Sequence, residues 1–168
     1  MCLIGFALEA DARFALVFAA NRDEYFDRPA EPAAWWRDRP ELFGGRDLEG
    51  GGTWLLVTRH GAFAAVTNVR QGLADRTAPR SRGELPLLAI EGREAEIRAD
   101  AQRFGGFNLV AGTLRPSPRL WWISNRAGGE CAHAIEPGVH GLANGGFGDP
   151  WPKVQSLSFL LQISNFSK

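Results

Sequence analysis

The residue of this sequence best suited to covalent chemistry is Cys2, which directly follows Met1 and begins an apolar run to Leu8. Removal of Met1 would leave a thiol and a free α-amino group on one residue. Because an α-amine has a pKa of roughly 7.7–8.0, part of it is neutral near pH 7 and accepts the thiol proton. This is the chemistry of enzymes whose nucleophile is their own first residue. The alternative is an ordinary buried cysteine, since free cysteine is among the most buried residue types.

Four consecutive polar residues, Asn21 to Glu24, follow the second apolar run of the chain. In a hairpin the end of the second strand lies beside the start of the first, so we expect this segment to approach Cys2. Arg22 would lower the pKa of the thiol, and Asp23 would hold the terminal amine. Both neighbours face the thiol only if a bulge interrupts the strand. The alternative is a polar strand exit with no chemical role.

Two asparagines stand at predicted strand ends in glycine-rich surroundings. Asn68 ends the run Ala64–Asn68, and Asn144 follows Gly141-Leu142-Ala143. Each alone is typical of turn chemistry, which asparagine favours. As a pair, their amide N–H groups would stabilise an oxyanion that develops on a substrate carbonyl.

A group of arginines follows Asn68 in a segment with several turn formers: Arg70, Arg76, Arg80 and Arg82. Such a group is either a solvated face or a binding site for a carboxylate or phosphate. Asn21, Arg70 and Arg82 are therefore candidate ligand-binding residues for a small acyl or anionic molecule. No phosphate-binding glycine motif is present, and the three histidines lack metal-site spacing, so we expect no bound metal and no resident cofactor.

Composition limits the other possibilities. At 168 residues the chain has the length of one domain, and equal numbers of acidic and basic residues argue against a nucleic-acid partner. The two cysteines, Cys2 and Cys131, are too few for a disulfide framework, although one bridge between them is an alternative to a reduced compartment. The sequence has neither a signal-peptide pattern nor an apolar run of about 20 residues. We expect a cytoplasmic protein without a membrane span.

The last segment, residues 156–168, differs from the rest of the chain. The arginine-, alanine- and glycine-rich composition stops there and gives way to Ser, Leu, Phe and Asn. A short helix is one interpretation. The other, which we favour, is that the chain is truncated or frameshifted relative to a longer parent.

Hydrophobic periodicity predicts hairpins towards both ends of the chain, with helices between them. The expected hairpins pair Cys2–Leu8 with Arg13–Ala20, Thr53–Thr58 with Ala62–Val69, and Phe107–Thr113 with Leu120–Ser124. The expected helices are Ser81–Ile90, Arg93–Phe104 and one that begins at Asp149; Glu130–Ile135 and Val139–Leu142 are short strands, and Asn21–Asp47 is irregular. The first two strands are apolar on both faces, which predicts a sheet covered on both sides. The pattern indicates an α+β fold of two stacked antiparallel sheets with helices outside.

Ordered short motifs give the chain a resemblance to a known family, the NRDE family, also called the transport and Golgi organisation protein 2 family. They begin with Met1-Cys2-Leu3-Ile4 and Asn21-Arg22-Asp23-Glu24, and they run to about residue 154. The other motifs are Gly51-Gly52-Thr53-Trp54-Leu55, Phe63 to Arg70, Ser81-Arg82-Gly83-Glu84-Leu85, Phe107-Asn108-Leu109-Val110, His140 to Asn144 and Pro150-Trp151-Pro152-Lys153-Val154.

The family is similar in turn to the N-terminal-nucleophile amidohydrolases, which implies an αββα sandwich of two antiparallel sheets between helix layers. By that likeness Cys2 matches the nucleophile, and Asn68 and Asn144 match oxyanion and amine contacts. Arg22 and Asp23 match an Arg-Asn-x-Asp element, although the order here is Asn-Arg-Asp-Glu. The late arginine of those enzymes falls beyond residue 168.

For biology, the resemblance implies either hydrolysis of an amide or thioester bond, or a non-catalytic carrier for haem or an acyl-CoA-like ligand. A third alternative is a non-functional fragment, since the site would lack the late arginine. Family members are associated with Golgi organisation and secretion in animals, and with lipid metabolism and haem trafficking more widely. The alanine-, arginine- and glycine-rich composition is typical of a bacterial protein.

Overall fold

The computed structural model describes residues 3–22, 24–69, 78–126, 133–150 and 152–156. Its first six strands are β1 (Leu3–Asp11), β2 (Phe14–Asn21), β3 (Ala30–Trp35), β4 (Leu42–Asp47), β5 (Leu55–Thr58) and β6 (Ala62–Asn68). A helical segment follows, with η1 (Arg82–Glu84), α1 (Leu85–Ile90), α2 (Glu94–Ala99) and η2 (Ala101–Arg103). The last strands are β7 (Phe107–Thr113), β8 (Arg119–Ser124), β9 (His133–Ile135) and β10 (Gly138–Leu142).

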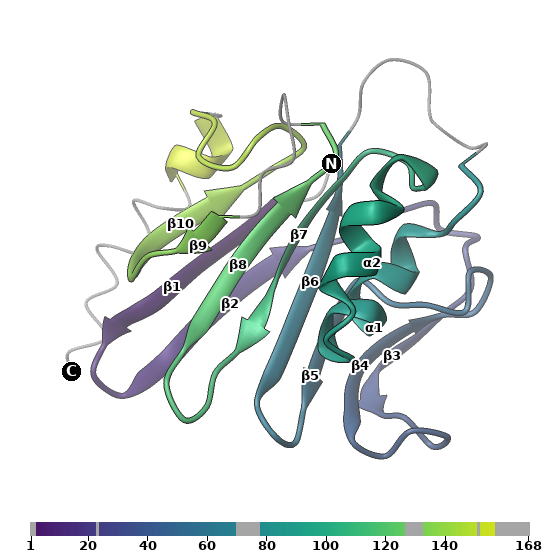
Figure 1. The fold of residues 1–168 in the computed structure, drawn as a ribbon, viewed down its shortest axis with the longest axis horizontal. Coiled ribbons are helices and arrows are strands. Elements are labelled where there is room, and N and C mark those ends of the chain that lie inside the picture. Colours follow the sequence, from purple (N-terminus) through teal and green to yellow (C-terminus); the bar gives the residue numbers. More distant parts are fainter. Residues whose placement is uncertain (1–2, 23, 70–77, 127–132, 151, 157–168) are drawn as a thin grey trace.

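The strands form two antiparallel sheets (Figure 1). The larger sheet has the order β3-β4-β5-β6-β7-β8-β9, so each strand pairs with its neighbour in sequence. The smaller sheet has the order β10-β1-β2, which returns the chain to its first strand after β9. In its register Leu3 pairs with Asn21, and Ile4 pairs with Leu142.

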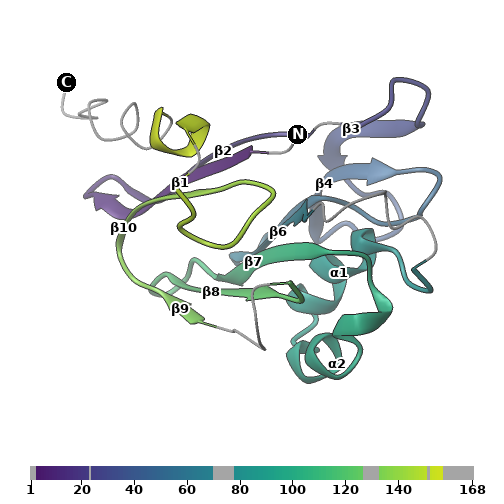
Figure 2. The same cartoon turned by 90° about the horizontal axis from the view of Figure 1, so that it is seen from above.

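The smaller sheet lies over one face of the larger sheet, and helices α1 and α2 cover the other face (Figure 2). A buried cluster fills the space between the sheets, with Phe6 and Leu8 from β1 against Phe63, Val110 and other residues of the large sheet. A second cluster joins Leu85, Leu88 and Ile97 of the helices to strands β6 and β7. Each face of the large sheet is therefore apolar, and burial of both faces drives this layering.

The start of the helical segment is fixed by local sequence. The side chain of Ser81 accepts a hydrogen bond from the Gly83 N–H, and the Glu84 carboxylate accepts one from the Ser81 N–H. This reciprocal capping box satisfies two backbone donors that a helix start leaves without partners. Pro86 then stands in the first turn of α1, where the missing N–H has no cost.

The three predicted hairpins and the α+β class are confirmed, with two differences from expectation. Residues 21–47 are not irregular, because β3 and β4 pair within them and extend the large sheet despite Pro32. Pro32 is tolerated because β3 is an edge strand of that sheet. Strand β2 is also an edge and is largely exposed, so the prediction that its sheet is covered on both sides is wrong for this strand.

Residues 152–156 are helical, close to the helix start predicted at Asp149. This short helix lies on the side of the small sheet that faces away from the large one (Figure 2). Along the described parts of the chain, no helix combines the length and apolarity that crossing a bilayer requires.

Candidate functional site

A cavity of about 1320 Å³ opens between the two sheets, at the end where β2 and β6 finish. Its walls come from segments distant in sequence: β1, the end of β2 with the residues after it, the β4–β5 region, β6, the turn before α1, the two glycines before β7, and Arg126 after β8. Many of the lining side chains are charged, and they include Arg22, Glu24, Arg28, Asp47, Glu49, Arg80, Arg82 and Arg126. A volume of this size accommodates a metabolite-sized ligand.

Arg22 lies in the wall just after β2 and is held from three sides. Its guanidinium carbon is 4.3 Å from the ring centroid of Trp54. One of its nitrogens lies 3.5 Å from a carboxylate oxygen of Glu24 and 3.6 Å from one of Asp47. A cation stacked on an indole and flanked by acids has a fixed direction.

Asp47, the last residue of β4, organises this wall. Its carboxylate accepts hydrogen bonds from the N–H groups of Glu49 and Gly50 and, at 2.8 Å, from Nε of Arg28. Burial is the largest influence and by itself would raise the pKa of Asp47, but the hydrogen bonds from Gly50 and Arg28 outweigh it and lower the pKa. Asp47 is therefore ionised at neutral pH and holds Arg28 in the wall.

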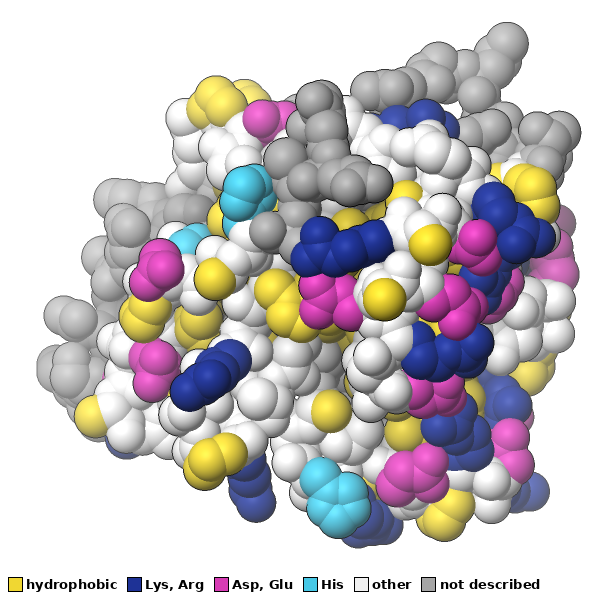
Figure 3. All heavy atoms as spheres, in the orientation of Figure 1, with side chains coloured by type: hydrophobic (Ala, Val, Ile, Leu, Met, Phe, Trp, Pro, Cys, Tyr) yellow, Lys and Arg dark blue, Asp and Glu magenta, His cyan; other side chains and the backbone are white. Residues whose placement is uncertain are grey.

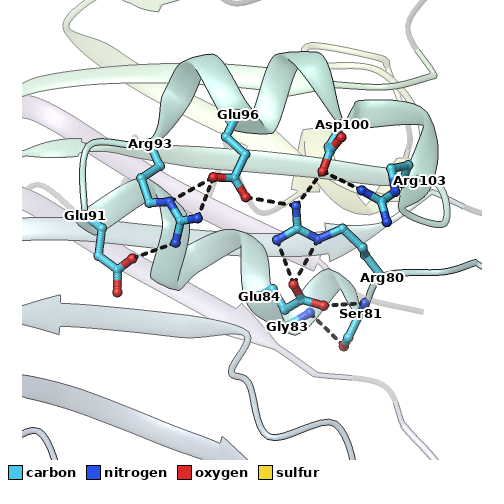
Figure 4. A network of polar contacts seen from close by, with 9 residues as sticks. All are labelled: Arg80, Ser81, Gly83, Glu84, Glu91, Arg93, Glu96, Asp100 and Arg103. Carbon is cyan, nitrogen blue, oxygen red and sulfur yellow. Dashed lines mark hydrogen bonds and ion pairs between the residues drawn. The ribbon is translucent and has the colours of Figure 1, made fainter.

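A network of ion pairs anchors the turn that precedes α1 (Figure 4). Arg80 pairs with Glu84 at 2.8 Å, with Asp100 at 2.8 Å and with Glu96 at 3.0 Å. Burial opposes the charge of Arg80, yet the three carboxylates raise its pKa above its usual value. The network joins the turn to α2 and continues to the surface through Arg93 and Arg103. Figure 3 shows the result as alternating basic and acidic side chains over the helical side of the molecule.

The glycine-rich segment before β5 packs directly on this turn. The Thr53 N–H donates to the Gly83 carbonyl oxygen at 3.0 Å. A Cβ placed on Gly52 would lie 2.3 Å from that oxygen, far inside van der Waals contact. Only glycine permits this approach. The motifs around Gly52 and Ser81, which are separate in sequence, thus form one structural unit beside the cavity.

The two predicted asparagines are in contact. The Asn144 side-chain amide donates to the backbone carbonyl oxygen of Asn68 at 2.5 Å. Asn108, fully buried on β7, holds the Asn144 loop by donating to the carbonyl oxygens of Ala143 and Gly145. Its own side-chain oxygen accepts from the Trp122 indole N–H. The side-chain oxygen of Asn144 is buried, and no donor among the residues described here lies within hydrogen-bond distance of it.

The structure therefore brings together most of the predicted site residues that it describes. Asn21, Arg22, Asn68 and Arg82 line the cavity. Asn144 is absent from the described lining and reaches the wall through Asn68. Cys2, Asp23 and Arg70 lie outside the described residues, as do Arg76 and Cys131. Cys2 is nevertheless bonded to Leu3, whose strand partner is Asn21.

Sequence reasoning did not find several residues of the cavity wall: Arg28, Asp47, Trp54 and Arg126. It also missed Asn108, which positions the Asn144 loop. A signal existed for Asn108, because an amide in the apolar run Phe107 to Ala111 is unfavourable to bury without partners. Across the described ranges, no group of three or more His, Cys, Asp or Glu side chains is arranged to hold a metal ion.

Two stacked antiparallel sheets, helices on the outer face of the larger sheet and a charged cavity at one end define an α+β protein with a ligand-sized site. The chain belongs to the family described as Transport and Golgi organisation 2, whose sequence profile matches residues 1–164.

Curated relatives agree with this assignment. The chain is 33% identical over 169 residues to the Transport and Golgi organization protein 2 homolog of Bos taurus, covering 92% of this chain and 60% of that protein. It is 32% identical to the homolog of Homo sapiens, with the same coverage, and 27% identical to Transport and Golgi organization protein 2 of Drosophila melanogaster, covering 90% of this chain and 59% of that protein. The chain thus spans about 60% of the length of these animal relatives, and the bacterial source expected from composition stays a prediction.

Proposed function

We propose that this protein hydrolyses the C–N amide or thioester bond of a small acyl substrate, with Cys2 as the nucleophile. In this proposal the fold is an αββα sandwich of the N-terminal-nucleophile type. Two features of the fold support the assignment. Leu3, the residue bonded to Cys2, pairs with Asn21, and Asn21 lines the cavity. The cavity is large enough for an acyl substrate and is lined by guanidinium groups that bind anions.

In the proposed reaction, loss of Met1 exposes the α-amine of Cys2, which takes the thiol proton. The sulfur attacks the substrate carbonyl carbon, and the tetrahedral intermediate collapses with cleavage of the C–N or C–S bond. The amine passes its proton to the leaving nitrogen or sulfur. Water then attacks the acyl-enzyme thioester, giving a carboxylic acid and restoring the thiol. A side-chain amide of Asn68 is the proposed donor to the oxyanion, and removal of one such donor costs about 10²–10³ in rate.

The observation that carries the proposal is the buried side-chain oxygen of Asn144, which lacks a donor within the described structure. A buried acceptor left without a partner costs about 1–3 kcal/mol, so such an atom points to a missing donor. Asn144 stands two residues after Leu142, the partner of Ile4 on β1. The donor that we propose is the α-amino group of Cys2, two residues before Ile4. Asn144 is then an amine-positioning residue and Asn68 an oxyanion donor.

Intact-mass spectrometry combined with probe labelling tests this function. We expect the purified protein to lack Met1 and an acyl thioester probe to add one acyl group. Cys2→Ala should abolish labelling, while Cys131→Ala, the matched change at the other cysteine, should leave it unchanged. Retention of Met1 in a fully folded sample, or equal labelling of Cys2→Ala, would refute the mechanism.

A second candidate function is carriage of haem or an acyl-CoA-like ligand without turnover, in keeping with the transport role in the relatives' names. The mixed lining of the cavity favours it, since apolar Phe18 and Leu55 face the same space as Arg22 and Arg82. Haem titration separates the two functions. A Soret shift that Cys2→Ala abolishes, without turnover of acyl probes, supports the carrier; turnover without a Soret shift supports the enzyme. A cytoplasmic location belongs to both proposals.

A further inference from the structure

The cavity has two chemically different ends. At one end, Leu55 of β5 pairs with Ala65 of β6, and both line the space. Phe18 of β2 also lines it and packs edge-on against Phe63, with ring centroids 5.1 Å apart. We call Phe18, Leu55 and Ala65 the apolar end. It offers a ligand hydrocarbon contacts and little to hydrogen-bond with.

The other end is built around Gly106, beside the last residues of β6. The Val69 N–H donates to the Gly106 carbonyl oxygen at 2.8 Å, and Arg82 Nη1 donates to the same oxygen at 3.3 Å. A Cβ on Gly106 would lie 3.1 Å from Nε of Arg126, so the Arg126 side chain packs onto this glycine. Two guanidinium groups from distant segments thus meet at one backbone position. We call Arg82 and Arg126 the arginine end.

Arg80 also lines the cavity, but it is committed elsewhere. Its guanidinium is surrounded by the carboxylates of Glu84, Glu96 and Asp100 (Figure 4). The hydrogen bonds of Glu84 to both Arg80 and the Ser81 N–H fix the turn that carries Arg82. The network therefore fixes the turn that carries Arg82, one of the two arginines that meet at Gly106.

The spacing of the two ends defines the length of a ligand. From Ala65 in β6 to Val69, the residue that follows this strand, the chain advances four residues, which corresponds to about 13 Å in extended conformation. Asn68, the proposed oxyanion donor, lies next to the arginine end. We infer that the cavity binds an anionic amphiphile, with a phosphate or carboxylate group on Arg82 and Arg126 and an apolar chain extending to Phe18, Leu55 and Ala65. As a statement about the substrate, this inference rests on the proposed function; as a statement about binding, it does not need catalysis.

Calorimetric titration of the Cys2→Ala protein tests the inference, since this variant binds without turnover. The probes are octyl phosphate, octanoate, octan-1-ol and inorganic phosphate. We expect octyl phosphate or octanoate to bind, and the tighter of the two identifies the head group. Octan-1-ol lacks the charge and inorganic phosphate lacks the chain, so each should bind at least about ten-fold more weakly, as expected when contacts with a charged group or apolar burial are lost.

Variants locate the head group. Arg126→Gln and Arg82→Gln should each weaken binding about ten-fold or more, and Arg126→Lys, which keeps the charge but loses the planar fork, should fall between. Arg119→Gln is the matched control, because this exposed arginine begins β8 at the opposite end from Arg126. Its affinity should equal that of the parent. Thermal unfolding of each variant verifies that it is folded.

Three outcomes overturn the inference: no amphiphile binds, octan-1-ol binds as tightly as the charged probes, or folded Arg126→Gln and Arg126→Lys both bind like the parent. Binding that follows the expected pattern in a protein whose Cys2 fails to react with acyl probes would refute the proposed hydrolysis alone. The two proposals therefore fail separately.

Discussion

The side-chain amide of Asn144 donates a 2.5 Å hydrogen bond to the backbone carbonyl oxygen of Asn68, joining residues 76 positions apart. Asn68 ends β6 in the large sheet, and Asn144 follows β10 in the small one. The bond ties the two sheets together at the end where the cavity opens. Thr67 strengthens the junction by donating from its hydroxyl to the Ala143 carbonyl oxygen at 3.4 Å. The cavity wall is therefore set by contacts between the sheets and not by either sheet alone.

Asn108→Ala should destabilise the protein far more than Asn144→Ala. Removal of Asn108 leaves the buried Trp122 indole N–H and the partly buried Gly145 carbonyl oxygen without their partner. We expect a loss of about 3 kcal/mol in the free energy of unfolding. In protein that retains Met1, and therefore lacks the amine donor proposed for Asn144, Asn144→Ala breaks one hydrogen bond but also removes an unsatisfied buried oxygen, so its cost should stay below about 1 kcal/mol. Urea denaturation measures both, and equal losses would contradict the assignment of Asn108 as the residue that holds the loop.

Arg80→Gln should show how much the ion-pair network contributes to the free energy of unfolding. The Arg80 side chain is only 15% exposed and serves three carboxylates, which lose their common partner in the variant. Glu96 and Asp100 keep their pairs with Arg93 and Arg103, but the hydrogen bonds from Arg80 to all three carboxylates are lost, which should cost about 2 kcal/mol. Arg98→Gln is the matched control on α2, because Arg98 and Glu94 form one half-exposed pair worth at most about 0.5 kcal/mol. Thermal or urea unfolding of both variants gives the comparison, and a small effect at Arg80 would mean that the network is dispensable.

The stability contributed by Asp47 should depend on pH. Hydrogen bonds from Gly50 and Arg28 outweigh burial and lower the pKa of Asp47 below its ordinary 3.8. A carboxylate whose folded pKa is depressed stabilises the fold above its unfolded pKa, and this stabilisation disappears as pH falls through the folded value. Asp47→Asn should therefore lower the free energy of unfolding most near about pH 6, and its difference from wild type should shrink below pH 3.8. A difference independent of pH would show that the charge of Asp47 is not what matters.

Some strands of the fold are predictable from the sequence, and others are not. The hairpin of β1 and β2 is predictable because both strands are continuous apolar runs with a short polar turn between them. Strands β3 and β4 escape prediction because Pro32 and the surrounding charges suppress the strand signal, and their pairing depends on an edge that only the folded sheet provides. Propensity is local, whereas strand pairing is a tertiary contact.

The residues of the candidate site are likewise of two kinds, those that the sequence predicts and those that it does not. Asn21, Arg22 and Asn68 are predictable because each stands at a strand end, where polar residues emerge from a core. Arg126 and Asp47 are not, because their place in the wall comes from the approach of distant segments at Gly106 and at the β4–β5 connection. The contact of Gly52 with Gly83 is equally unpredictable, because the spacing of these residues along the chain does not indicate that they meet.

Trp54 should control the reactivity proposed for Cys2 through its hold on Arg22. The centroid of the Trp54 ring lies 4.3 Å from the Arg22 guanidinium carbon. Stacking on the indole holds the guanidinium in one orientation and limits its approach to the neighbouring carboxylates. Trp54→Leu removes this platform, so Arg22 is free to turn fully towards Glu24 and Asp47, now 3.5 and 3.6 Å away. The pKa of a neighbouring thiol would rise as the positive charge withdraws. We expect labelling of Cys2 by an acyl probe at about pH 7 to slow several-fold and its pH profile to move to higher pH, whereas Trp54→Phe should retain most of the rate because phenyl also stacks. An unshifted profile in Trp54→Leu would separate Arg22 from the chemistry of Cys2 and confine it to ligand binding.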